Sequence, residues 1–232
     1  NTQTDIDFGK AVLERFANPF IRHMLLSIAL NSVSKFQVRV LPTILEHKEK
    51  FGNYPEGLVM SMAALIAFYS RAGENYFGGA YRRISVGNTE KVAEMLADLT
   101  GGELYQIEQA EPYLDDYKTC VAQAREDWQK NARPAVLNLP DDLDAYDEIY
   151  LGYPNYCSTM PMAVYTFLEH YDFTGKTIHP FCTHEGSGLS DTENDIRKAA
   201  HGAAVTKGLA IHGSHVAEAK SALAQWVEEV KR

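Results

Sequence analysis

Five short apolar segments follow one another between residues 65 and 213, and a stretch with helical periodicity comes after each of them. The apolar segments span residues 65–69, 103–107, 148–152, 177–183 and 209–213. The helical stretches span residues 88–99, 115–130, 162–170, 191–200 and 216–230. Because parallel strands need helical crossovers, this alternation predicts an α/β fold, a parallel sheet with helices on both faces. Ligands of such sheets bind at the carboxyl ends of the strands, so functional residues are expected just after each strand.

The segment before the first strand has a different character. Residues 8–50 carry apolar side chains at helical spacing, among them Phe20, Met24 and Ile28. Residues 50–57, Lys-Phe-Gly-Asn-Tyr-Pro-Glu-Gly, have the composition of a loop. The sequence therefore predicts a helical extension over residues 1–62 and an α/β domain over residues 63–232.

Charge is unevenly distributed along the chain. Residues 1–62 hold seven Lys and Arg against six Asp and Glu, whereas the rest holds 15 of the 22 basic and 25 of the 31 acidic residues. A strongly acidic domain repels nucleic acids and anionic membrane surfaces and attracts basic proteins, so we expect no nucleic-acid partner. The helical stretch 115–130 contains several of the acidic residues and is interpreted as a solvated outer face.

Neither the cysteines nor the apolar stretches indicate a metal site or a membrane span. Cys120, Cys157 and Cys182 lie far apart and match no metal-binding or redox spacing. They are interpreted as free thiols in a reducing cytoplasm, so the sequence predicts a cytoplasmic protein. The longest nearly apolar stretch, Leu58 to Tyr69, has 12 residues, fewer than the ~18 that a membrane-spanning helix needs.

The loop after the first strand is divided by an insertion. Ser70-Arg71 follows the strand, and Gly87-Asn88-Thr89 opens the next helix. Removing residues 72–85 leaves Ser-Arg-Val-Gly-Asn-Thr between strand and helix. Hydroxyls and free backbone N–H groups at a helix N-terminus, with the helix dipole behind them, are what a phosphate needs. The alternative is that Ser70 and Thr89 are only cap and turn residues.

Two further loops after strands suit a planar aromatic ligand. In residues 152–161 the backbone is shaped by Pro154 and Pro161, and Tyr156 offers a ring face. In residues 183–190 Gly186 and Gly188 allow the backbone to approach a flat ring closely. A tyrosine that only packs against the protein is the alternative interpretation of Tyr156.

Residues 64–232 resemble the flavodoxin-like family, in a subgroup with a longer phosphate loop and an added helix after the second strand. The stretches that carry the resemblance are residues 67–75, 86–93, 150–156 and 184–188. The resemblance implies a five-stranded parallel sheet in the order 2-1-3-4-5, and flavin mononucleotide (FMN) as the cofactor.

It also implies roles for residues in the three loops. The residues implied to hold the phosphate are Ser70, Arg71, Gly87, Asn88 and Thr89. Those implied to contact the isoalloxazine are Pro154, Asn155 and Tyr156, with Thr159 and Met160 closing that loop. Those implied to line the other side of the ring are Thr183, Glu185, Gly186, Ser187 and Gly188. No catalytic or metal-binding residue is predicted.

One pair of residues departs from the pattern of this subgroup. Cys157-Ser158 stands where the subgroup commonly has an aromatic residue and a glycine. We expect this change to affect how the ring is stacked and how the backbone beside flavin N5 turns. A serine would make that turn harder than a glycine would.

Residues 8–69 resemble a different family. The stretches 15–23 and 34–42 are similar to part of the helical C-terminal domain of long-chain mannitol-type dehydrogenases such as tagaturonate reductase. The Lys-Asn-His motif of that family is absent and there is no room for a dinucleotide domain, so hexuronate dehydrogenase activity is not expected. Self-association through residues 1–62 is one hypothesis for this segment.

Three functional hypotheses stay open. The first is an FMN-binding electron carrier whose partner is a redox protein or a small acceptor. The second is an FMN-dependent reductase that passes electrons from NAD(P)H to a quinone. The third is a protein that keeps the fold but has lost its flavin. For the first two, acidic surface near the flavin would lower its redox potential.

Overall fold

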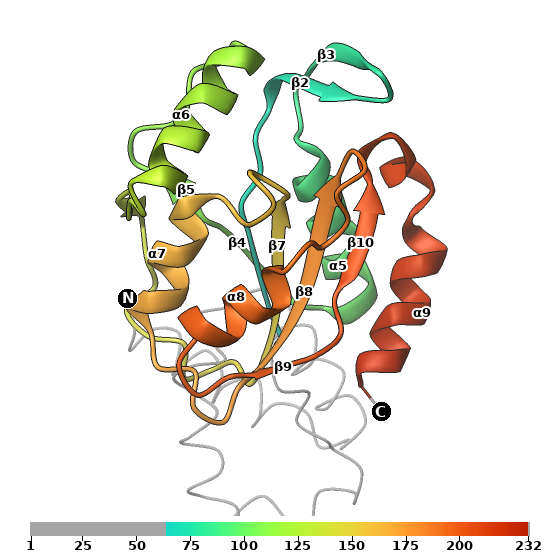
Figure 1. Ribbon diagram of the computed structural model, residues 1–232. Coiled ribbons are helices and arrows are strands. Elements are labelled where there is room, and N and C mark those ends of the chain that lie inside the picture. Colours follow the sequence, from blue (N-terminus) through green and yellow to red (C-terminus); the bar gives the residue numbers. More distant parts are fainter. Residues whose placement is uncertain (1–63, 232) are drawn as a thin grey trace, which may run out of the picture. The chain divides into compact units, whose positions relative to one another are not determined.

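The computed structural model describes residues 64–231, which are coloured along the sequence in Figure 1. The chain divides into two units, residues 1–60 and residues 61–232, and the description that follows concerns the second unit. The helical extension predicted over residues 1–62 lies outside the described residues.

A parallel sheet forms the centre of the domain (Figure 1). Its strands are β1 (Leu65–Phe68), β4 (Glu103–Gln106), β7 (Glu148–Pro154), β8 (Thr177–His184) and β10 (Leu209–His212). They run in the order β10-β8-β7-β1-β4, and every neighbouring pair is parallel. Numbered along the chain this is the order 2-1-3-4-5, so the predicted fold class and strand order are confirmed. A short strand, β9 (Ala204–Val205), pairs with β8.

Helices cover both faces of the sheet (Figure 1). On one face α7 (Met162–His170) and α8 (Thr192–Ala199) bury Phe167 and Ile196 against the sheet. On the other face α5 (Asn88–Thr100) and α9 (Lys220–Val230) bury Leu96 and Leu223. All four residues of β1 are buried because this central strand is covered on both sides.

The insertion of residues 72–85 forms a β-hairpin that extends beyond the carboxyl end of the sheet (Figure 1). Its antiparallel strands are β2 (Gly73–Phe77) and β3 (Ala80–Ile84). Gly78 and Gly79 form the turn with φ angles of 59° and 75°, which glycine adopts without strain. The sequence did not predict the path of this segment.

The remaining elements are short or lie outside the sheet. Helix α6 (Tyr117–Gln129) begins after Asp116, whose carboxylate accepts a hydrogen bond from the backbone N–H of Thr119. The short strands β5 (Glu108–Gln109) and β6 (Val136–Leu137) pair with each other. The 3₁₀ helix η1 (Gly213–Glu218) precedes α9, where one continuous helix from residue 216 was predicted. Within residues 64–231 no helix has the length and apolar character needed to cross a membrane.

Candidate functional site

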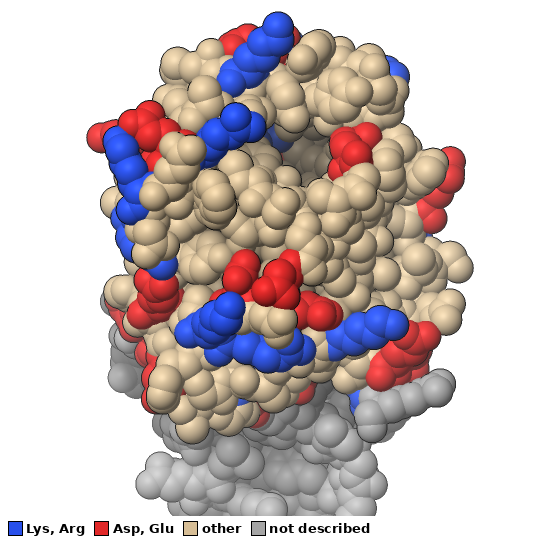
Figure 2. All heavy atoms as spheres, in the orientation of Figure 1, with Lys and Arg blue, Asp and Glu red and all other residues tan. Residues whose placement is uncertain are grey.

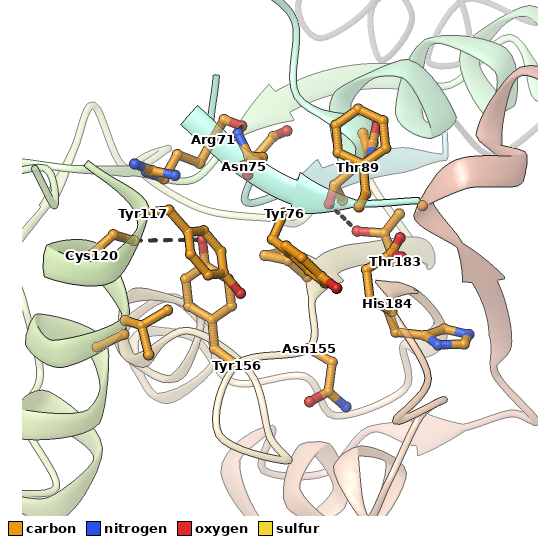
Figure 3. Close-up of a pocket in the computed structure, with 18 of the residues that line it drawn as sticks. Arg71, Asn75, Tyr76, Thr89, Tyr117, Cys120, Asn155, Tyr156, Thr183 and His184 are labelled. Atoms are coloured by element: carbon orange, nitrogen blue, oxygen red, sulfur yellow. Dashed lines mark hydrogen bonds between the residues drawn. The ribbon is translucent and has the colours of Figure 1, made fainter. Parts of the chain in front are cut away.

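A cleft of about 260 Å³ lies at the carboxyl ends of β1, β7 and β8 (Figure 3). Its lining comes from the loops after these strands, from the hairpin β2–β3 and from helix α6. The cleft lies where the order of the strands reverses, between β1 and β7, which is the expected ligand position in an open α/β sheet. The three loops chosen from the sequence therefore meet at one site.

The first turn of α5 offers free hydrogen-bond donors to the cleft. Ser70 Oγ accepts a hydrogen bond of 3.1 Å from the backbone N–H of Glu90. The backbone N–H groups of Asn88 and Thr89 have no partner among residues 64–231. They carry the positive end of the helix dipole, so this turn is suited to an anion.

Gly87 allows the two halves of the divided loop to approach each other. A Cβ atom at this position would lie 2.1 Å from Ser70 Oγ and 2.8 Å from the carbonyl oxygen of Arg71. Any other residue would push Ser70 away from the start of α5. Gly87 itself is buried behind Ser70 and does not line the cleft.

Arg71 lines the cleft but uses its guanidinium to hold other backbone segments. The group donates hydrogen bonds to the carbonyl oxygens of Glu74, Leu114 and Asp115. These bonds join the start of the hairpin to the segment before α6. In this structure the Arg71 head group therefore shapes the wall of the cleft.

The second loop turns through two strained residues. Tyr156 and Thr159 exchange two backbone hydrogen bonds of 2.9 Å, and Cys157 and Ser158 form the two-residue turn between them. The φ angles of Cys157 and Ser158 are 54° and 63°. Turns of this kind favour glycine and asparagine because other residues pay a steric cost at positive φ. The departure noted in the sequence therefore falls on the residues that must adopt this conformation.

The side chain of Tyr156 packs against buried residues on the side away from the cleft. Its ring meets that of Tyr69 edge to face, with centroids 6.3 Å apart, and its hydroxyl lies 4.0 Å from Cys120 Sγ. Desolvation raises the pKa of Tyr156 well above its usual value of 10.0, so the phenol stays neutral. The side chain is a fixed, uncharged part of the lining.

The second and third loops are tied together. Asn155 Nδ2 donates to the Gly188 carbonyl and to Ser190 Oγ, both at 3.0 Å, and the backbone N–H of Asn155 donates to the Thr183 carbonyl. The hydroxyls of Thr89 and Thr183 lie 2.8 Å apart and join the start of α5 to the end of β8. The three loops are thus cross-linked around the cleft.

The structure brings nine of the predicted residues to the lining of the cleft. They are Ser70, Arg71, Asn88, Thr89, Pro154, Asn155, Tyr156, Thr183 and Glu185. Gly87, Gly186, Ser187 and Gly188 lie in the same loops but outside the lining.

Thr159 and Met160 also lie outside the lining, and their side chains point into the protein. The Thr159 hydroxyl donates to Asp195 Oδ2 at 2.7 Å, and Met160 is buried in the core. These two residues fix the end of the second loop.

One wall of the cleft was not predicted from the sequence. Helix α6 contributes one whole face, made of Tyr117, Cys120, Val121, Ala124 and Arg125. The interpretation of this helix as a solvated outer face is therefore wrong for these positions. The first four positions follow the i, i+3, i+4, i+7 spacing of the apolar face of an amphipathic helix. This spacing is present in the sequence, although the acidic residues of the helix suggested a solvated surface.

The hairpin forms the other unexpected part of the lining. Strand β2 contributes Asn75, Tyr76 and Phe77. At the tip of the hairpin the backbone N–H of Gly78 donates a hydrogen bond of 3.0 Å to Glu185 Oε2, across the cleft from α6. The insertion thus bridges the first and third loops.

Acidic residues do not gather on the lining of the cleft. Its charged lining residues are Arg71, Arg125 and Glu185. Figure 2 shows the hollow in the upper part of the molecule with basic side chains on one side and acidic ones on the other. The lining of the cleft is therefore not acidic, although the domain as a whole is.

Comparison with known families decides the affiliation. The flavodoxin profile matches residues 79–230, which is more than half of the chain. The chain belongs to the flavodoxin family. The profile of the mannitol dehydrogenase C-terminal domain matches residues 2–127, so the N-terminal part of this flavodoxin-family protein belongs to that family as well. Both resemblances found in the sequence are confirmed. Where the two matches overlap, over residues 79–127, the structure has elements β3 to α6 of the flavodoxin-like domain.

Two solved structures have the same fold. A candidate flavoprotein from Bacteroides uniformis is 25% identical, with a TM-score of 0.57, and the match covers 72% of this chain and 97% of that one. A second candidate flavoprotein, from Bacteroides eggerthii, is 23% identical with a TM-score of 0.52, over 70% of this chain and 98% of that one.

The curated relatives match a short segment. The altronate oxidoreductase of Yersinia pestis is 51% identical over 73 residues, or 31% of this chain and 15% of that enzyme. The altronate oxidoreductase of Pectobacterium carotovorum is 54% identical over 69 residues, or 29% of this chain and 14% of that enzyme. The chain thus spans about 15% of the length of these relatives.

Proposed function

We propose that this flavodoxin-family protein binds FMN without a covalent link and transfers electrons through it. The observation that carries the proposal is the first turn of α5. There the free N–H groups of Asn88 and Thr89 face a cleft shared with two loops suited to a planar ring. Gly87 supports the fit, because its missing side chain lets Ser70 close on the helix end. Backbone donors lie at one end of a cleft that can admit a flat ring. This arrangement suits a ligand that has a phosphate at one end.

The roles of the residues follow from their positions. Ser70, Asn88 and Thr89 would bind the phosphate, and Pro154, Asn155 and Tyr156 would border one side of the ring system. Thr183 and Glu185 would border the other side. FMN, when bound, supplies the electron-transfer chemistry, while the protein binds, orients and shields it.

A direct test is the visible absorption spectrum of the purified chain after addition of excess FMN and gel filtration. About one flavin per chain, retained through the column, supports the proposal. A folded protein that emerges colourless overturns it, and favours a flavodoxin-like protein that has lost its flavin.

A flavin-dependent reductase of small acceptors is the second candidate. The wall formed by α6 and the hairpin beside the three loops favours it, because a cleft enclosed in this way admits small molecules more easily than a protein surface. Steady-state oxidation of NAD(P)H with a soluble quinone separates the two. Turnover well above that of free FMN would identify a reductase, and its absence would favour a carrier with a protein partner. The match to altronate oxidoreductases covers about 15% of those enzymes, and that activity is not proposed for this chain.

A further inference from the structure

Most of the tyrosine and phenylalanine rings at the cleft come from the inserted hairpin and from α6. Among the residues that the sequence predicted to bind the cofactor, one such ring lines the cleft, that of Tyr156, and position 157 carries a cysteine. The other tyrosine and phenylalanine rings are Tyr76 and Phe77 on strand β2 and Tyr117 at the start of α6. Figure 3 shows Tyr76 pointing from the hairpin into the cleft, with Tyr117 and Tyr156 toward one end and Thr183 toward the other.

The hairpin that carries Tyr76 is fixed at its base. Asp115 forms an ion pair with Arg83 on strand β3, and its carboxylate accepts the backbone N–H of Glu74 at 3.2 Å. Glu74 Oε2 in turn accepts the backbone N–H of Tyr117 at 2.9 Å. The same contacts therefore position the two tyrosines relative to each other.

The hairpin is fixed at its tip as well. The hydrogen bond between the Gly78 N–H and Glu185 Oε2 joins it to the loop after β8. A two-stranded hairpin is marginally stable alone, so attachment at both ends is what holds it across the cleft. Tyr76 therefore enters the cleft from a hairpin that is held at both ends.

Tyr76 and Tyr117 belong to a cluster of three rings. The centroids of Tyr76 and Tyr117 are 6.1 Å apart, and each lies 5.5 Å from the ring of Tyr81. Tyr81 is 53% exposed and does not line the cleft, whereas Tyr76 lines it and is still 40% exposed. Tyr81 thus supports the other two rings from outside and leaves part of Tyr76 uncovered at the cleft.

We propose that Tyr76 and Tyr117 pack against the isoalloxazine ring of FMN and supply the aromatic contact that Cys157 does not. This inference rests on the proposed function, because it names the residues that bind the flavin in that same cleft. Packing between aromatic systems is favourable in offset or edge-to-face arrangements, and a ring bound there would be enclosed by the hairpin and α6. The insertion in the phosphate loop then serves the ring end of the cofactor as well.

The test uses the full chain and titrates FMN into Tyr76→Leu and Tyr117→Leu. We expect each to raise the Kd for FMN about tenfold, which is typical of the loss of one stacked ring. The fluorescence of the bound flavin should rise in both, because a packed tyrosine quenches it. A matched control leaves the cleft and the tyrosine cluster intact. Trp128→Leu removes an exposed ring of α6 that is 49% accessible and lies outside the lining.

Each result decides the inference. Wild-type Kd and fluorescence in Tyr76→Leu and Tyr117→Leu would overturn it, and so would a Trp128→Leu control that weakens binding as much as these variants do. Tyr76→Phe keeps the ring and should bind FMN within about twofold of wild type, so a loss there as large as in Tyr76→Leu would also contradict it. If the wild-type chain binds no FMN, the proposed function fails first and the inference fails with it.

Discussion

Tyr156 and Thr159 exchange two backbone hydrogen bonds of 2.9 Å, which forces the two residues between them into the left-handed region. A glycine at the second position would adopt the same turn without steric cost. We expect Ser158→Gly to raise the free energy of unfolding by about 1 kcal/mol, since relief of the strain exceeds the entropy that glycine adds to the unfolded chain. Urea denaturation measures this value.

The matched control for that change is Ser85→Gly, because Ser85 is exposed and does not have a positive φ. It should leave stability unchanged or lower it slightly. A Ser158→Gly protein no more stable than wild type would contradict the strained turn.

The contact between Gly78 and Glu185 makes a second prediction. Glu185→Ala removes the acceptor that holds the tip of the hairpin, so the hairpin should open more often. The loss of one such hydrogen bond, about 1 kcal/mol, corresponds to amide hydrogen exchange several-fold faster at Gly78. Glu185→Gln keeps an acceptor oxygen and should stay closer to wild type. Equal exchange rates in the alanine variant and wild type would show that the tip is held by other contacts.

The proposed phosphate site can be tested by charge. Asn88→Asp places a carboxylate in the first turn of α5, where it suits the helix dipole and should not destabilise the fold. It would lie beside a bound phosphate and repel it, so the Kd for FMN should rise at least about tenfold at low salt. Riboflavin lacks the phosphate, and its binding should change little. An equal loss of affinity for FMN and riboflavin would show that the phosphate does not bind at the first turn of α5.

A fourth prediction concerns the ion pair between Arg133 and Glu169, which is bidentate with N–O distances of 2.6 and 2.7 Å. The hydrogen bond from Arg133 lowers the pKa of Glu169 below its usual value of 4.5. A carboxyl group with a depressed folded-state pKa stabilises the protein above its unfolded pKa, and that stabilisation is lost as the pH falls through the folded value.

Glu169→Gln should therefore cost about 0.5 kcal/mol at pH 7, a small value because the pair is partly exposed, and less as the solution is acidified below pH ~4. Thermal unfolding at several pH values measures the difference. A cost that stays constant or grows on acidification would contradict the pairing.

Much of the fold was predictable because its elements are long and regular in pattern. The helix predicted over residues 162–170 has those bounds in the structure, and each of the five predicted strands lies within a few residues of its expected bounds. Alternation of strands and helices constrains a chain to few topologies, and the resemblance to flavodoxins supplied the strand order.

The position of the hairpin of residues 73–84 could not be predicted, because it depends on distant contacts. Its base is held by Asp115 and its tip by Glu185, and neither contact leaves a sign in the local sequence. For the same reason Tyr76 was not recognised as a residue of the cleft.

Helix α6 shows a different reason for error. Glu126 on this helix is exposed, as predicted for a solvated helix, but Tyr117, Val121 and Ala124 line the cleft. The acidic content of the helix drew attention away from the helical spacing of its less polar residues. The positive φ angles of Cys157 and Ser158 were indicated in the sequence only by the departure of these two residues from the pattern of related proteins.

The most direct measurement is a calorimetric titration of the wild-type chain with FMN and, separately, with riboflavin. If the first turn of α5 binds the phosphate and the cleft binds the ring, FMN should bind at about one molecule per chain and at least tenfold more tightly than riboflavin. No binding of FMN, or equal affinity for both ligands, would contradict the proposed flavin site.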